Sequence, residues 1–213
     1  MVQVILVRHG ETDWNRSRRV QGGGSDTYLN NTGKEQAEAL AERFKPETIQ
    51  AVYSSPLQRA LHTAQAIARH HRLEVQVEPA LSELNVGKLE GTQVESLGKR
   101  LDELLTVPGQ DKTQEDGKET LWRKIEDVGG ESLAELQRRA WGTIQHIVNR
   151  HPDSVIVAVS HYFTILTIIC AVLDLPLSQI GRFRLGVSGV STIVFDGPVA
   201  RLTSFSDICH LNT

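Results

Sequence analysis

A short apolar run at the start of the chain ends abruptly in a charged and polar motif. Residues 2–7 are mostly apolar and rich in β-branched side chains, as is typical of a buried strand, and Arg8 and His9 follow directly. Open α/β sheets place their ligand sites at the carboxyl ends of strands. A histidine there, with fixed positive charge beside it, is a candidate nucleophile toward an anionic centre such as phosphorus.

Segments typical of strands and of helices alternate along the rest of the chain. The expected strands cover residues 51–54, 73–77 and 155–159, with two or three more over 182–205, at least one of them at a sheet edge. The expected helices cover residues 32–44, 56–67, 92–107, 132–147 and 162–173. This alternation predicts an α/β protein, a three-layer α/β/α sandwich around a mostly parallel, doubly wound sheet.

Three of the expected helices carry start signals. Thr32 and Ser132 are each followed three residues later by a glutamate, which predicts a capping box at each position. Ser55 followed by Pro56 predicts an N-cap and a first-turn proline. The first turn at Pro56 then offers free backbone donors to an anion.

The length of the chain fits one domain. Its 213 residues, 39% of them hydrophobic, support a real core, and we expect a single domain over residues 1–213 with a helical or loop insertion at about 92–130. The stretch from 108 to 120 is polar and charged and is the expected lid. The carboxylates between Asp102 and Glu131 are interpreted as a solvated face.

Composition limits the kinds of partner that this chain can be expected to bind. A net charge of −3 with no basic stripe argues against nucleic acid. The longest apolar run, residues 162–173, is too short to span a bilayer, so no membrane partner is expected. Cys170 and Cys209 form neither a disulfide framework nor a metal pattern and indicate reduced thiols in a cytoplasmic protein. An edge strand in the tail leaves a homodimer open.

Four chemistry-bearing side chains follow predicted strands. Arg8 and His9 follow the first strand, Arg59 lies one helical turn after the second, and His161 follows residues 155–159. In a doubly wound sheet these positions converge on one crevice, and two arginines with two histidines make it strongly cationic. Arginine forks bond phosphate oxygens bidentately. Glu83 would supply the acid that a phosphate-ester leaving group needs, if its loop folds over the crevice.

These motifs resemble the histidine phosphatase superfamily, also called the phosphoglycerate-mutase-like family. The matching segments, in family order, are Arg8-His9-Gly10-Glu11-Thr12 with Trp14-Asn15, Ser54 to Ala60 with Thr63-Ala64, Leu81-Ser82-Glu83-Leu84 with Leu89-Glu90-Gly91, and Val159-Ser160-His161. Four motifs in order, each at an expected strand end, are far more specific than any one of them. The segment Gly129-Gly130-Glu131-Ser132 resembles the bacterial phosphatase branch, which includes α-ribazole phosphatases.

The resemblance implies a ping-pong mechanism. His9 attacks phosphorus and becomes phosphohistidine, and Glu83 protonates the departing oxygen and then activates water. The non-bridging oxygens are held by Arg8, Arg59 and His161, helped by Asn15. No metal or other cofactor is implied, because fixed cations do the electrostatic work.

Three further positions bear on the substrate, which the resemblance implies is a small-molecule phosphate ester. Gln21 and Gly22 resemble the family's substrate-side loop, although a simple glycine-rich turn is an equal interpretation. Tyr162 stands where the family commonly has glycine, so it narrows the pocket or brings a phenol into it.

Two other functions stay open at this point. A phosphoglycerate mutase of this family carries a longer insertion with consecutive arginines, a pattern that residues 91–130 lack. A non-catalytic phospholigand-binding protein on the same fold would have lost His9, Glu83 or an arginine, and all are present.

Overall fold

A mixed sheet forms the middle of the molecule in the computed structural model, which describes residues 1–97 and 125–211. Among these residues the sheet has six strands, in the order β3-β2-β4-β1-β5-β6. Their bounds are Val2–Arg8 (β1), Ala51–Ser54 (β2), Val75–Val77 (β3), Val155–Ser160 (β4), Val190–Asp196 (β5) and Val199–Asp207 (β6). The first four are mutually parallel, whereas β5 and β6 are antiparallel to their neighbours. The mostly parallel sheet is confirmed, and β6 is the expected edge strand.

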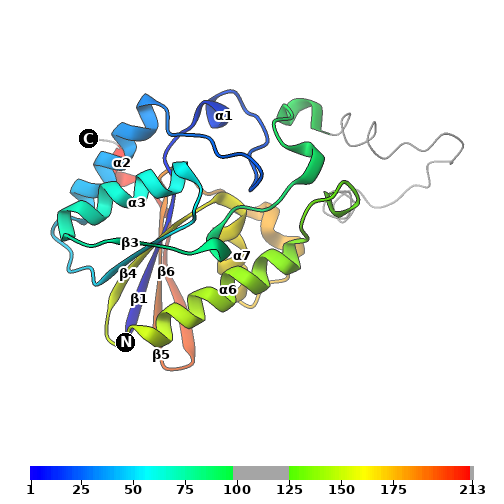
Figure 1. Ribbon diagram of the computed structural model, residues 1–213. Helices are drawn as coiled ribbons and strands as arrows, with labels where there is room; N and C mark the ends of the chain where they lie inside the picture. Colours follow the sequence, from blue (N-terminus) through cyan, green and yellow to red (C-terminus); the bar gives the residue numbers. More distant parts are fainter. Residues whose placement is uncertain (98–124, 212–213) are drawn as a thin grey trace, which may run out of the picture.

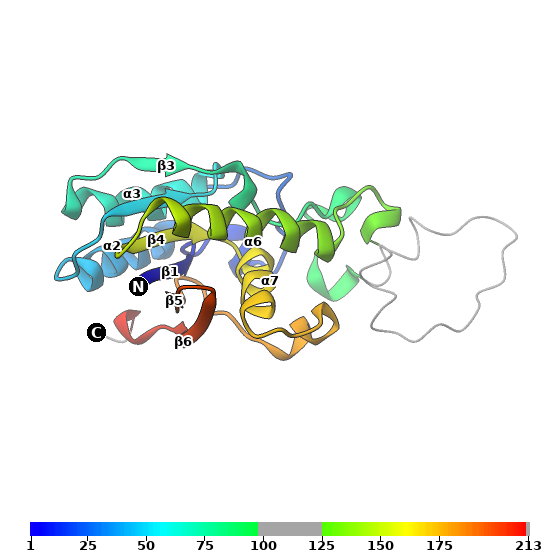
Figure 2. The same ribbon diagram turned by 90° about the horizontal axis from the view of Figure 1, so that it is seen from below.

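Helices cover both faces of this sheet, so the three-layer prediction is confirmed. Helices α2 (Asn31–Phe44) and α3 (Gln58–His71) lie on one face, and α6 (Leu133–Arg150) and α7 (Tyr162–Val172) lie on the other (Figures 1 and 2). The short elements are α1 (Asp13–Arg16), η1 (Pro79–Leu81), η2 (Gly87–Leu89), η3 (Val94–Ser96), η4 (Leu177–Arg182) and η5 (Cys209–Leu211). None of the helices that the structure describes is long and apolar enough to cross a membrane.

The strand side chains alternate between two cores. In β1, Val4 and Leu6 join the cluster under α6 and α7, while Ile5 and Val7 join the cluster under α2 and α3. Because both faces of such a parallel strand are buried, its sequence is a continuous run of apolar residues. With both faces of β1 anchored, its register is fixed, and Arg8 is set opposite Ser160 at the carboxyl end of β4.

Of the three predicted helix starts, one is correct and two are displaced. Ser132 forms the predicted capping box at α6. Helix α2 is capped instead by Asn30, whose Oδ1 accepts the Gly33 N–H at 2.8 Å. Helix α3 begins at Gln58, after a cap at Leu57 without a side-chain bond, and Ser55 lies outside it. The Gln58 N–H is bonded by Asp26 Oδ1 at 2.6 Å, so that donor is already used.

The Ser132 cap supports a stability prediction. Ser132→Ala removes the hydroxyl that accepts the Glu135 N–H at 3.1 Å, which we expect to lower the free energy of unfolding by about 1 kcal/mol. Urea denaturation at constant m-value measures the change. Ser178→Ala, at an exposed position in η4, is the control and is expected to stay within about 0.5 kcal/mol of the parent. An equal loss in both variants would contradict the capping assignment.

The expected insertion at about 92–130 falls largely on residues 98–124, outside the described residues, as does most of the helix expected over 92–107. The described beginning of that stretch holds only η3. The single-domain boundary over residues 1–213 stays a prediction.

Candidate active site

The turn after β1 fixes His9 in one orientation. His9 is 3% exposed, and its Nδ1 lies 2.7 Å from the Gly10 carbonyl oxygen. Since a carbonyl only accepts, Nδ1 carries the proton and Nε2 keeps its lone pair. Gly10 is required here, because a Cβ would lie 2.5 Å from the Gly33 carbonyl oxygen, and its own N–H donates to Thr63 Oγ1 at 3.2 Å. The turn therefore presents the nucleophilic nitrogen of a neutral imidazole.

His161 lies beside His9, because β4 pairs with β1. The two ring centroids are 5.1 Å apart, and His161 is fully buried. Its Nε2 is 2.7 Å from Ser55 Oγ. Burial, followed by the charges of Arg59 and other nearby groups, holds the pKa of both histidines well below the usual value. Both rings are therefore neutral in the free protein at pH 7.

Two arginines, Arg59 fully buried and Arg8 partly buried, supply the positive charge. Arg8 donates to the Leu185 carbonyl at 2.6 Å and lies over the Tyr162 ring, 5.1 Å from its centroid. Arg59 is fully buried and donates to the carbonyls of Ser25, at 2.8 Å, and Gly22, at 2.9 Å. Burial lowers the pKa of Arg59 to about 10 and also lowers that of Arg8. Both guanidiniums stay charged at pH 7, and because they are shielded from water their charge acts strongly on a bound anion.

Three buried nitrogens of this cluster have no hydrogen-bond partner. Among the described residues, these are Arg8 Nε, Arg59 Nε and His161 Nδ1. Buried polar atoms are nearly always paired, and an unpaired one in a native structure needs an explanation. Two of the three belong to fixed cations whose charges act on His9, and the third belongs to the neighbouring His161 ring, so they suit the oxygens of a bound anion such as phosphate.

Glu83 reaches the site from the loop after η1, as its motif implied. Its Oε1 accepts the N–H groups of Leu84, at 2.8 Å, and Thr164, at 3.2 Å, and its Oε2 accepts the Phe163 N–H at 3.1 Å. Burial outweighs these bonds and the charges of the site arginines, and it raises the pKa of Glu83. The carboxyl therefore binds a proton more readily than an ordinary glutamate does.

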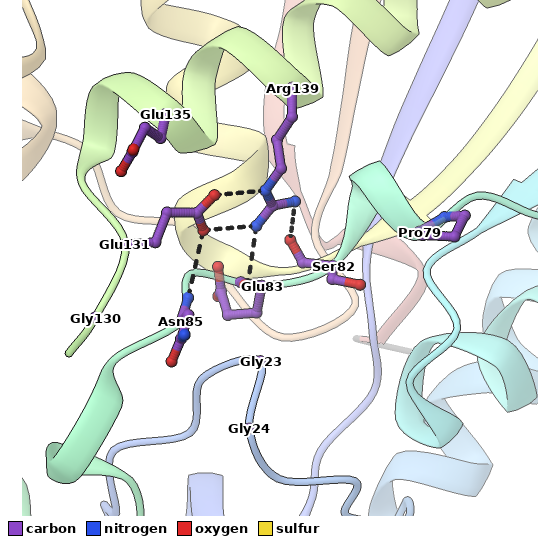
Figure 3. Close-up of a pocket in the computed structure, with 10 residues that line it drawn as sticks. All are labelled: Gly23, Gly24, Pro79, Ser82, Glu83, Asn85, Gly130, Glu131, Glu135 and Arg139. Atoms are coloured by element: carbon purple, nitrogen blue, oxygen red, sulfur yellow. Dashed lines mark hydrogen bonds and ion pairs between the residues drawn. The ribbon is translucent and has the colours of Figure 1, made fainter.

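Arg139 of α6 holds the loop that carries Glu83 (Figure 3). Its Nε and Nη2 bond the two carboxylate oxygens of Glu131 at 2.7 and 2.9 Å. Its remaining donors reach the carbonyls of Ala80 at 2.7 Å, Ser82 at 2.8 Å and Glu83 at 3.2 Å. One guanidinium thus fixes the main chain on both sides of the acid. The interpretation of Glu131 as part of a solvated face is wrong, because it forms this pair.

We expect Arg139→Gln to lower kcat/KM for an alkyl phosphate by about 10- to 100-fold, because misplacing a catalytic group by about 1 Å has such an effect. The loss should be larger for an alkyl phosphate than for 4-nitrophenyl phosphate, whose leaving group does not need the proton from Glu83. Arg139→Lys keeps the positive charge but not the planar guanidinium, so it should recover part of the lost activity. Equal losses on both substrates would instead indicate general destabilisation.

The cluster opens into a cavity of about 470 Å³. Its described lining includes six of the predicted site residues, which are Arg8, His9, Asn15, Gln21, Glu83 and Tyr162. Asn15 Nδ2 donates to Gln21 Oε1 at 3.2 Å, and the Tyr162 hydroxyl donates to the Phe183 carbonyl at 3.1 Å. Arg59, Gly22 and His161 lie behind this surface. Gly22 is needed at its position because a Cβ would lie 2.6 Å from the Leu84 carbonyl oxygen.

The fold therefore brings every predicted site residue into one region, and it adds three that the sequence did not single out. Ser55 bonds His161, Thr164 bonds Glu83, and Arg139 holds the acid loop. Ser55 lies inside a quoted motif, which is a usable signal, whereas Arg139 on its helix has none. Among the described residues, no three His, Cys, Asp or Glu side chains gather in a way that would hold a metal ion.

A mostly parallel α/β sheet with two histidines and two arginines in a pocket at the carboxyl ends of its parallel strands defines a class of phosphate-handling proteins. The family model of the histidine phosphatase superfamily (branch 1) matches residues 4–208 of this chain. The chain belongs to that superfamily, and it is an enzyme of the phosphomonoesterase type found there.

Named relatives agree with this class. Phosphoserine phosphatase 1 of Hydrogenobacter thermophilus is 33% identical over 213 residues, covering 99% of this chain and 95% of that protein. A probable phosphoglycerate mutase, GpmB of Photorhabdus laumondii, is 33% identical over 226 residues, covering 100% and 96%. The crystal structure of phosphoserine phosphatase from Entamoeba histolytica in complex with 3-phosphoglyceric acid superposes with a TM-score of 0.81 at 31% identity, covering 99% of this chain and 100% of that one.

Proposed function

We propose that this protein is a metal-independent phosphatase that hydrolyses small-molecule phosphate monoesters through a phosphohistidine formed at His9. The observation that carries the proposal is the set of unpartnered nitrogens of Arg8, Arg59 and His161 around the neutral His9 ring. The two guanidiniums supply the fixed charge that a metal ion supplies in other phosphoryl-transfer enzymes, and His161 adds a ring nitrogen that can bond a phosphate oxygen.

In the first step His9 Nε2 attacks phosphorus, and the bond from phosphorus to the ester oxygen breaks. Glu83 gives its proton to that oxygen, so the alcohol leaves neutral. Arg8, Arg59 and His161 bind the non-bridging oxygens, and Asn15 with Gln21 borders the same space. Gly22 contributes by accepting from Arg59 through its carbonyl, which orients the guanidinium.

In the second step Glu83 acts as a base instead of an acid. Now a carboxylate, it takes a proton from a water molecule whose oxygen attacks phosphorus, and the bond from phosphorus to His9 Nε2 breaks. Inorganic phosphate then leaves. The lowered pKa of His9 favours this step, because the released imidazole is stable in its neutral form.

The acid role of Glu83 predicts a pH dependence. Because burial raises the pKa of Glu83, the required protonated form persists to higher pH than for an ordinary carboxyl and is lost as pH rises through that pKa. We expect kcat/KM for an alkyl phosphate to decline as pH rises through the pKa of Glu83. For 4-nitrophenyl phosphate we expect kcat/KM to decline much less over the same range. Parallel pH profiles for the two substrates would contradict this assignment of the acid.

Phosphate release from a substrate panel tests the proposed function. The panel holds 4-nitrophenyl phosphate, sugar phosphates, phosphoglycerates, nucleotides and α-ribazole phosphate, each with and without EDTA. We expect release that EDTA does not diminish. Loss of activity in EDTA would overturn metal independence. Conversion of 3-phosphoglycerate to 2-phosphoglycerate without phosphate release would establish the mutase alternative, which the similarity to GpmB proteins also supports.

Two further predictions concern the cellular location and the oligomeric state of the protein. A cytoplasmic location is inferred from Cys170 and Cys209, both free thiols. The edge position of β6 leaves a homodimer open, as the sequence does. Light scattering after size-exclusion chromatography distinguishes a monomer from a dimer at micromolar concentration.

A further inference from the structure

The walls of the active-site cavity differ in character from its floor. The floor is polar and charged, with Arg8, His9 and Glu83. The described walls are mainly apolar, with Val86 and Leu89 at η2, Val94 and Leu97 at η3, and Ile125 and Ile180. Four of these six, all but Val94 and Leu97, are almost fully buried and belong to the packed core. The apolar surface is thus continuous with the site where phosphorus would react.

Such walls favour an apolar ligand body. Burial of apolar ligand surface against such walls favours binding, and a pocket with apolar walls and a few convergent polar groups is typical of small-molecule sites. The cavity of about 470 Å³ is far larger than a phosphorylated three-carbon chain needs. A short polar ester would leave the accessible part of the apolar wall, at Val94 and Leu97, in contact with water.

The charged side chains that line the cavity are mostly positive. Arg8, Arg19 and Arg184 line it, and neither Arg19 nor Arg184 makes an ion pair or side-chain hydrogen bond with another described residue. The one carboxylate in the described lining is Glu83, whose two oxygens already accept main-chain N–H groups. Among the described lining residues, an ammonium group on the substrate would therefore meet three guanidiniums and no free carboxylate, which costs binding.

We infer that this site takes phosphate monoesters whose organic part is apolar and larger than a three-carbon chain, and that it disfavours esters carrying an ammonium group. The inference rests on the proposed function and names its substrate class. It also separates this chain from the phosphoserine phosphatases that it resembles at 31% and 33% identity. The apolar walls supply affinity, and the arginines supply the discrimination.

The test compares three alkyl phosphates, which all need protonation of their leaving group. We expect kcat/KM for 2-phenylethyl phosphate to exceed that for O-phosphoserine by at least about tenfold, since apolar-pocket contacts give discrimination of this size. The comparison of 3-phosphoglycerate with O-phosphoserine isolates the charge, because the two differ only by hydroxyl against ammonium. We expect 3-phosphoglycerate to be turned over the faster of the two.

A substitution in the wall links the preference to this cavity. Val94 is 43% exposed, so Val94→Asp can be made without burying a charge. We expect it to lower kcat/KM for 2-phenylethyl phosphate by about fivefold or more and to narrow the advantage over O-phosphoserine. Val199→Asp is the matched control, because Val199 is 44% exposed on β6 and outside the cavity lining. Its substrate preference should equal that of the parent.

The outcomes separate this inference from the proposed function. Turnover of O-phosphoserine as fast as or faster than 2-phenylethyl phosphate would overturn the inference and leave a phosphatase. A preference that Val94→Asp does not change would also overturn it, because the apolar body would then bind elsewhere. Absence of phosphate release from every ester would overturn the proposed function, and the inference with it.

Discussion

His9→Ala is expected to lower kcat/KM for 4-nitrophenyl phosphate by a factor of about 10⁴ or more, as removal of a covalent nucleophile does in other enzymes. The Gly10 carbonyl holds the proton on Nδ1, so Nε2 is the attacking atom, and alanine has no replacement for it. The arginines and His161 remain in place, so the variant should still bind inorganic phosphate. A loss of turnover with retained phosphate binding is the signature of a missing nucleophile.

The control and the covalent readout sharpen this test. His146→Ala, at an exposed position in α6, should keep parental activity. Rapid quenching of the parent with substrate, followed by mass spectrometry under alkaline conditions, should place one phosphoryl group on the peptide containing His9, and His9→Ala should show none. Circular dichroism establishes that the variant is folded. Near-parental turnover by folded His9→Ala would remove this residue from the nucleophile role.

The placement of His9, Arg8 and His161 was predictable because it depends on topology. Once residues 2–7 and 155–159 are parallel neighbours, the residues that follow them must lie side by side at one edge of the sheet. The predicted three-layer sandwich follows from the same alternation of strands and helices. In each case a long-range arrangement follows from local patterns that agree with one another.

The errors arise where one side chain has two possible partners. Ser55 precedes a proline and has the sequence of an N-cap, but its hydroxyl bonds His161 and the helix begins at Gln58. Thr32 has a glutamate three residues on, yet Asn30 reaches the helix end first and also donates to Glu11 at 2.8 Å. A capping pattern states what a side chain can do locally, whereas tertiary contacts decide which option is used.

The role of Arg139 could not be predicted, because its contacts with the acid loop are all long-range. It meets the carbonyls of residues 80, 82 and 83 across the space between α6 and the acid loop. Main-chain carbonyls carry no sequence signal, so nothing in the pattern of α6 distinguishes this arginine from a solvated one. Tyr162 is similar: only the structure shows its ring beneath Arg8 and its hydroxyl on Phe183.

Glu83→Gln is expected to lower kcat/KM for 2-phenylethyl phosphate by about 10²- to 10⁴-fold, the usual size of general acid catalysis. The amide is close in shape and can keep some of the hydrogen bonds from the N–H groups of Leu84, Phe163 and Thr164, but it has no acidic proton to give. For 4-nitrophenyl phosphate the loss in kcat/KM should stay below about tenfold, because nitrophenolate leaves without protonation.

The choice of kcat/KM matters, because it reports only the steps up to release of the alcohol. Glu83 also activates the water that cleaves phosphohistidine, so kcat should fall for both substrates. Mixing Glu83→Gln with 4-nitrophenyl phosphate should therefore release a rapid burst of nitrophenolate equal to the enzyme, followed by slow turnover. Glu74→Gln, at an exposed position before β3, should behave like the parent. Equal losses in kcat/KM for the two esters, or turnover without a burst, would assign the proton transfers to another group.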